Sequence, residues 1–115
     1  MQYLLLLHVD EKAMQAATPE QTTATLAAYG VYVKAMTDAG VNKGGQRLRP
    51  TSTATTVRVK EGKTQALNGP CAEIKEQLGG YFLIDAPDLD AAISWAARCP
   101  AAQHGAVEVR PIWQM

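Results

Sequence analysis

Apolar residues fill two segments of the chain without interruption. Residues 3–7 read YLLLL and residues 81–84 read YFLI. A strand at either segment carries apolar side chains on both faces, because successive side chains point to opposite faces of a sheet. We therefore predict two central strands, Gln2–His8 and Gly80–Asp85, each covered on both sides.

Capping signals and apolar residues at helical spacing predict two helices. Thr18 is a good N-cap with Pro19 at the first helical position, and this helix is expected to run to about Ala39. Asp88 caps the second helix, and Pro100 forces it to end one or two residues earlier. The first helix carries a stripe rich in alanine, which lets it lie close on a sheet, and the inward stripe of the second is Leu89, Ala92, Ile93 and Ala96.

Three further strand regions complete the pattern. Asn42–Leu48 follows the first helix, Thr55–Lys60 and Lys63–Leu67 form a solvated hairpin around a Glu-Gly turn, and Ala106–Trp113 is the last strand. The order predicts an α+β fold, a ferredoxin-like βαβ-βαβ sandwich with an added β-hairpin. In this arrangement both helices pack on one face of the sheet.

The two-faced strands predict an assembly. Helices cover one face only, so the apolar side chains on the other face need a different cover. A second copy packed sheet against sheet would hide several hundred Å² per chain at roughly 25 cal/mol per Å². We therefore expect a homodimer built face to face, with a ligand cleft between helices and sheet or at the dimer seam.

Composition narrows the function classes. The 115 residues indicate one domain, 1–115, and 11 basic residues balance 11 acidic ones, so nucleic acid is not expected as a direct ligand. No apolar run is long enough for a membrane span, and no signal peptide is recognised, so we predict a cytoplasmic protein without a membrane partner. Cys71 and Cys99 lack metal-ligand spacing and are read as free thiols. Neither a metal nor a cofactor is expected.

A histidine and an aspartate near the end of the first strand are the catalytic candidates. His8 stands two residues before Asp10, and a carboxylate that orients an imidazole could support proton transfer. The alternative is a surface histidine beside a solvated loop.

Ligand-binding candidates are polar residues beside strand ends and turns: Arg47, Arg49, Glu73, Lys75, Tyr81 and His104. Arg47 and Arg49 are two apart in a strand, share a face and could clamp an anion, although arginines also solvate sheet edges. Glu73 and Lys75 follow Pro70 and suit the first turn of a short helix, either at a ligand or as a charged surface. Tyr81 follows two glycines, and the alternative is a buried tyrosine of the core. His104 precedes a glycine, and the alternative is a residue that fills a turn.

Several segments resemble the YCII-related family, and in particular its branch named for a DGPF motif. The matching segments are residues 3–7 (YLLLL), 44–48 (GGQRL), 52–58 (STATTVR), 68–81 (NGPCAEIKEQLGGY) and 107–111 (VEVRP). The resemblance covers nearly the whole chain and implies a dimeric α/β barrel of ferredoxin-like protomers. It also implies kinship with a dehydrochlorinase-like member and with others that have a suspected His-Asp pair.

The chain departs from the family pattern at two places. Asn68-Gly-Pro-Cys71 stands where the branch has Asp-Gly-Pro-Phe, so an amide replaces the carboxylate. The family histidine in the first helix corresponds to Tyr29, which cannot act as a base near neutral pH without a large pKa shift. The family dyad is therefore not carried over to this chain.

Two functions are open from the sequence. The first is a small-molecule binder or an enzyme of lyase or isomerase type, with a pocket near His8, Asp10, Arg47, Glu73 and Tyr81. The second, which the family resemblance implies, is an accessory or regulatory protein associated with sigma-factor-dependent transcription. The first predicts an enclosed pocket with converging polar groups, and the second predicts an exposed patch without such a pocket.

Overall fold

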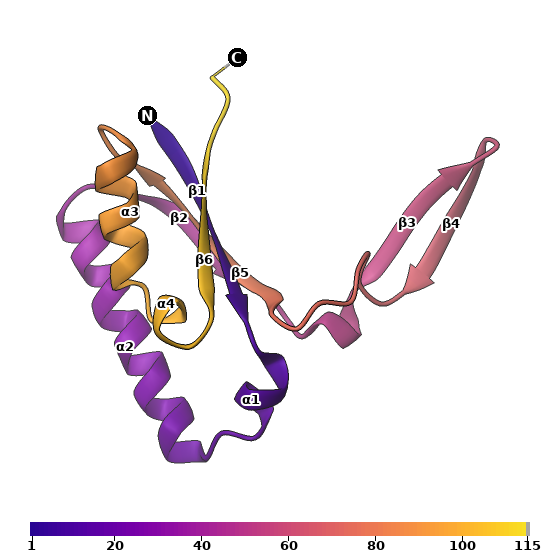
Figure 1. Ribbon diagram of the computed structural model, residues 1–115, viewed down its shortest axis with the longest axis horizontal. Helices are drawn as coiled ribbons and strands as arrows, with labels where there is room; N and C mark the ends of the chain where they lie inside the picture. Colours follow the sequence, from indigo (N-terminus) through magenta and orange to yellow (C-terminus); the bar gives the residue numbers. More distant parts are fainter. Residues whose placement is uncertain (115) are drawn as a thin grey trace.

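A four-stranded antiparallel sheet forms the centre of the molecule (Figure 1). The structure, a computed structural model, describes residues 1–114. The strand order is β2 (Asn42–Arg47), β5 (Gln77–Asp85), β1 (Gln2–Val9) and β6 (Ala106–Pro111). All three pairings are antiparallel, and the two apolar segments form the central strands β1 and β5. The predicted mixed α+β class is confirmed.

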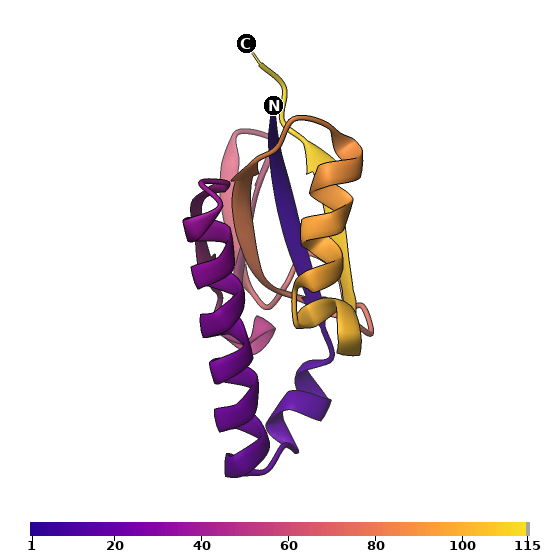
Figure 2. The ribbon, with the colours of Figure 1, turned by 90° about the vertical axis from the view of Figure 1, so that its left-hand side faces the viewer.

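Helices α2 (Pro19–Asp38), α3 (Leu89–Arg98) and α4 (Ala101–His104) cover one face of this sheet (Figure 2). The predicted Thr18 cap starts α2 and forms a capping box, because Thr18 Oγ1 accepts from the backbone N–H of Gln21 at 3.1 Å and the Gln21 side chain accepts from the backbone N–H of Thr18 at 2.9 Å. Asp88 caps α3 in the same way through the backbone N–H of Ala91. None of the helices within residues 1–114 combines the length and hydropathy that crossing a bilayer needs.

The core lies between the helices and the sheet. Tyr3, Leu5 and Leu7 alternate along β1 toward the helices and are buried. They meet Tyr32 and Met36 of α2. The Tyr32 hydroxyl donates to the Trp95 carbonyl oxygen at 2.8 Å, so the polar end of this buried ring is paired.

The opposite face of the sheet has no helix among the described residues. By strand alternation and register it carries Leu4, Leu6, His8, Leu78, Tyr81, Leu83, Glu108 and Arg110, which we call the uncovered face. Leu4, Leu6 and Leu83 remain only half-buried by their neighbours in the sheet. The apolar residues predicted on both faces of β1 and β5 are therefore present, and the helices of residues 1–114 cover one of those faces.

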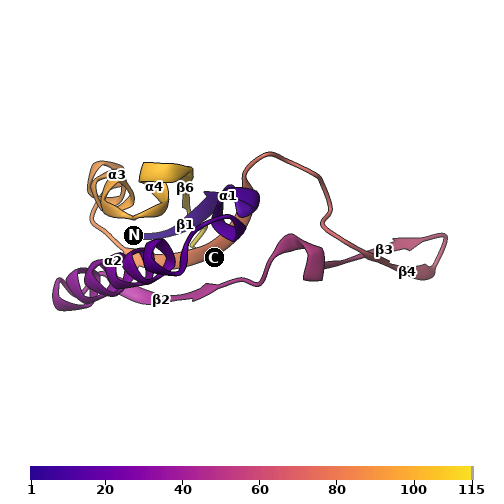
Figure 3. The ribbon, with the colours of Figure 1, turned by 90° about the horizontal axis from the view of Figure 1, so that it is seen from below.

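The predicted hairpin is a separate two-stranded sheet, β3 (Thr55–Lys60) and β4 (Lys63–Asn68), which we call the arm. It stands away from the rest of the molecule (Figure 3). Glu61 and Gly62 form its turn with φ values of 52° and 74°, the positive values that a tight two-residue hairpin needs. A 3₁₀ turn, η1 (Thr51–Thr53), precedes it.

Two local predictions are wrong. Residues 70–76, which include Glu73 and Lys75, form no helix. The Gln77 side chain donates to the Ile74 carbonyl oxygen, so a side chain satisfies a group that a helix would have bonded along its own backbone. The last strand ends at Pro111 instead of Trp113. β1 begins at Gln2, whose carbonyl oxygen accepts from the backbone N–H of Ile112 at 3.0 Å, so the partner strand offers little backbone beyond this point.

Candidate functional site

A cavity of about 460 Å³ lies on the helix-covered side of the sheet. Its walls come from the short helix α1 (Glu11–Gln15), from α2, from β1 and β5, and from β2 with the three residues that follow it. Most of the lining is apolar, contributed by Leu7, Val9, Met14, Ala17, Leu26 and Phe82. A few polar side chains interrupt this wall, which is the usual composition of a small-molecule site.

Close packing of β2 against β5 shapes the floor of the cavity. A Cβ at Gly45 would lie 2.6 Å from the Tyr81 carbonyl oxygen and 2.6 Å from the Phe82 ring. A Cβ at Gly80 would lie 2.9 Å from the Gln46 carbonyl oxygen. Gly45 stands opposite Phe82 and Gly80 stands opposite Arg47, and the absence of side chains at these two glycines lets β2 and β5 approach.

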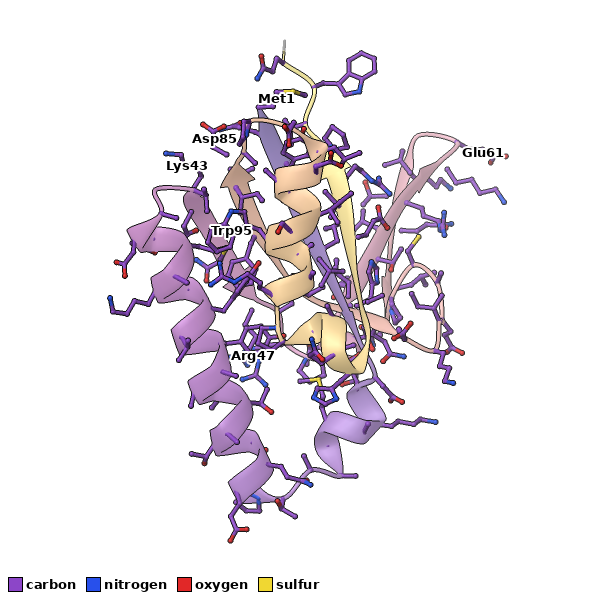
Figure 4. All side chains as sticks on the ribbon, turned by 60° about the vertical axis from the view of Figure 1, so that its left-hand side comes forward. Met1, Lys43, Arg47, Glu61, Asp85 and Trp95 are labelled. Carbon is purple, nitrogen blue, oxygen red and sulfur yellow. The ribbon has the colours of Figure 1, made fainter. Side chains whose placement is uncertain are left out.

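Two guanidinium groups lie in the cavity wall. Arg47 ends β2 and Arg49 follows two residues later, and both line the cavity, as the sequence analysis suggested for a shared ligand (Figure 4 labels Arg47). Both side chains are exposed. An arginine at a partly open cavity can bind a carboxylate or phenolate with paired hydrogen bonds.

Glu11 supplies a carboxylate to the same wall. Its Oε1 accepts from the Thr51 hydroxyl at 2.6 Å, and its Oε2 accepts from the Thr51 backbone N–H at 2.9 Å. The backbone N–H of Glu11 donates to the Gln77 side chain at 3.0 Å. Glu11 thereby joins α1 to β5 and to the root of the arm. The sequence analysis missed this residue, because a contact across 40 positions leaves no local pattern.

Tyr29 of α2 faces the cavity beside Arg47 and the buried thiol of Cys99. Burial of the phenol, followed by the proximity of Cys99, raises the pKa of Tyr29 to about 12. The positive charge of Arg47 works in the opposite direction and does not cancel the effect. Tyr29 therefore keeps its proton at neutral pH and can donate a hydrogen bond to a ligand.

Alkaline pH is expected to destabilise the fold through Tyr29. The pKa rises from 10.0 to about 12 on folding, so the unfolded chain releases this proton first. The stability contribution is full below pH 10.0 and is lost as pH rises toward 12. Urea unfolding across this range should show a shallower loss of stability for Tyr29→Phe than for the wild type. Equal slopes for the two proteins would contradict the assignment.

The two catalytic candidates of the sequence analysis are not brought together. His8 lies on the uncovered face, where its Nε2 is 3.8 Å from Glu108 Oε1. Asp10 caps α1, because its Oδ1 accepts from the backbone N–H of Ala13 at 3.1 Å. Neither residue lines the cavity.

The remaining candidates are divided between the cavity and the surface. Tyr81 borders the cavity where β2 and β5 meet, but by register its side chain lies on the uncovered face. Glu73, Lys75 and His104 are exposed and lie outside the cavity wall. Within residues 1–114, no three His, Cys, Asp or Glu side chains gather where they could hold a metal ion.

Similarity to known proteins agrees with this architecture. A solved structure, 5-chloro-2-hydroxyhydroquinone dehydrochlorinase from Burkholderia phenoliruptrix AC1100 in complex with 2,5-dihydroxybenzoquinone, is similar with a TM-score of 0.57. The similarity covers 99% of this chain and 94% of that chain at 15% sequence identity, which shows a common fold only.

Sequence comparison gives the family. An uncharacterized protein of Rhizobium meliloti (strain 1021) is 35% identical over 114 residues, which are 97% of this chain and 92% of the relative. The YCII-related domain matches residues 1–115, the whole length of the chain. The chain therefore belongs to the YCII-related domain family.

Proposed function

We propose that this protein binds a small organic acid with an apolar body in the cavity between α2 and the sheet. The observation that carries the proposal is a cavity of about 460 Å³ whose largely apolar wall includes the residues Arg47 and Arg49. The apolar wall suits a ring or short hydrocarbon body, and the arginines suit its anionic end.

The structural neighbour supplies a probe of this chemical class. It was determined with 2,5-dihydroxybenzoquinone, a planar ring with two acidic hydroxyl groups. Such a ring would place an anionic oxygen near Arg47. Its flat faces would lie among apolar residues of the wall such as Leu26 of α2 and Phe82 of β5. The comparison chooses the probe, and the lining of this chain's own cavity supports the binding.

A reaction of the lyase or isomerase type follows as the chemical extension of this proposal. Glu11 is the carboxylate of the wall and would accept a proton, Tyr29 would donate one, and Arg47 would stabilise the negative charge that develops on the substrate. The predicted pair of His8 and Asp10 has no part in this proposal, because neither residue lines the cavity and Asp10 caps α1. The regulatory hypothesis predicts no such pocket. The cavity therefore favours the small-molecule hypothesis.

We also propose that the chain is a ferredoxin-like protomer of a homodimeric α/β barrel. The strand order β2–β5–β1–β6, with helices on one side only, supports this. Leu4, Leu6 and Leu83 on the uncovered face supply the apolar surface that a second copy would bury.

Blocking the cavity mouth should abolish binding of the probe. Leu26 and Val31 are both exposed apolar residues of α2, at 52% and 72%, and only Leu26 lines the cavity. Calorimetric titration with 2,5-dihydroxybenzoquinone should give at least about 10-fold weaker binding for Leu26→Trp, because the indole occupies the space of the ligand. The matched Val31→Trp variant should bind like the wild type. Equal affinities for the two variants would contradict the location of the site.

A further inference from the structure

The arm is an ordered hairpin with few contacts to the body of its own chain. It joins the body at Ala54 and Gly69, where the Gly69 backbone N–H donates to the Ala54 carbonyl oxygen at 2.7 Å. Beyond this point β3 pairs only with β4 (Figures 1 and 3). A two-stranded hairpin alone is marginally stable in water, so a stable arm needs a surface to pack against.

The arm also makes the chain much more extended than a compact domain. The radius of gyration is 16.0 Å. A compact chain of this length has about 13 Å. The difference fits a segment that reaches beyond its own molecule.

The two faces of the arm differ in charge. Val57 and Val59 share one face with Thr64 and Ala66, which stand opposite them in β4. The other face carries the cations Arg58, Lys60 and Lys63 together with Gln65 and Leu67. Val57 and Val59 are 58% and 68% exposed. Exposed strands usually carry charges that discourage pairing with other molecules, and this face has none.

The position of the arm indicates what covers this face. Figures 1 and 3 show α2 and α3 on one side of the four-stranded sheet and the arm on the other, the side of the uncovered face. When two copies pack their uncovered faces together, each copy lies on the side of its partner from which the partner's arm extends. A two-fold axis makes the contact reciprocal.

We infer that the uncharged face of the arm, formed by Val57, Val59, Thr64 and Ala66, packs on a second copy of this chain, so that the two copies exchange arms. The inference rests on the proposed homodimer and adds a second contact to it. The basic face, with Arg58 and Lys60, then remains in solvent, where charged side chains are expected.

Charged residues on the two faces of the arm test the inference. The variant Val57→Asp/Val59→Asp places two carboxylates on the uncharged face, and the control Gln65→Asp/Leu67→Asp places two on the basic face. Sedimentation equilibrium should give a dimer Kd at least about 10-fold higher for the first variant. The control should stay within about twofold of the wild type. Equal Kd values for the two variants would overturn the inference.

Hydrogen exchange gives a second readout that leaves the arm sequence unchanged. Leu6→Lys alters the uncovered face, far from the arm in sequence, and is expected to separate the two copies. Amides of β3 and β4 should then exchange faster than in the wild-type dimer. Unchanged protection in a monomeric Leu6→Lys variant would show that the arm does not depend on a partner and would overturn the inference. If the wild-type chain is itself monomeric, the proposed homodimer is wrong together with the arm contact. If the wild type is a dimer and the arm does not depend on the partner, only the arm contact is wrong.

Discussion

Replacing Leu6 by lysine is expected to convert the proposed dimer into a monomer. Leu6 lies at the centre of the uncovered face, between Tyr81 of β5 and Glu108 of β6. The two-fold axis introduces the charge twice, and taking an ammonium out of water costs several kcal/mol even beside a carboxylate, so the dimer Kd should rise by about 1,000-fold or more. Light scattering at micromolar concentration should report half the wild-type mass.

The chain itself should tolerate this substitution. Glu108 stands opposite position 6 in the neighbouring strand, so the lysine gains an ion pair when a single copy is exposed to water. Val31→Lys provides the control, because Val31 is exposed on α2 and lies on no predicted interface. It should leave the mass unchanged. A Leu6→Lys variant that keeps both its fold by circular dichroism and the mass of a dimer would contradict the face-to-face arrangement.

Replacing Arg47 by glutamine is expected to weaken binding of 2,5-dihydroxybenzoquinone by about 10- to 100-fold, because hydrogen bonds to charged groups contribute about 1.5–3 kcal/mol each. Arg47→Lys should recover only part of the loss, since a lysine keeps the charge and loses the paired donors. Calorimetric titration measures both effects.

A second residue of the same strand provides the control for Arg47. Lys43 lies on β2 and is exposed, and it does not line the cavity (Figure 4 labels both residues). Lys43→Gln removes the same charge from the protein and should leave the affinity unchanged. If Lys43→Gln and Arg47→Gln weaken binding equally, the attraction is a general effect of net charge and the assigned role of Arg47 is wrong.

Local signals in the sequence predicted most of the fold. Thr18 and Pro19 mark the start of α2, and the apolar segments at 3–7 and 81–84 mark the two central strands. The Glu61-Gly62 turn marks the arm. These features depend on neighbouring residues only, so they are readable without tertiary contacts.

Short elements were harder to predict, because a few residues show no helical or strand period in the sequence. The five residues of α1 are too few to show a helical period, and Asp10 was therefore interpreted as a catalytic partner when its side chain caps this helix. The predicted short helix after Pro70 is also too short to show a period, and it does not form. Instead the Gln77 side chain donates a hydrogen bond to the carbonyl oxygen of Ile74.

The candidate site was predictable only in part. Arg47 and Arg49 were singled out because residues two apart on a strand share a face, and both line the cavity although β2 ends at Arg47; ligand binding by them stays a prediction. Glu11 was missed, since its bonds to Thr51 connect distant segments. Tyr29 was correctly judged unable to act as a base, and its pKa of about 12 agrees with that reading. Membership of the DGPF branch, the dimer and the cytoplasmic location stay predictions.

Mapping the probe on the protein by amide chemical shifts tests the central claim most directly. The claim is that an acidic ring binds between α2 and the sheet, against Arg47. Titration with 2,5-dihydroxybenzoquinone should shift saturably the amides of residues that line the cavity, among them Met14, Leu26 and Phe82. Shifts confined to the uncovered face or to the arm, or no saturable shift at all, would contradict it.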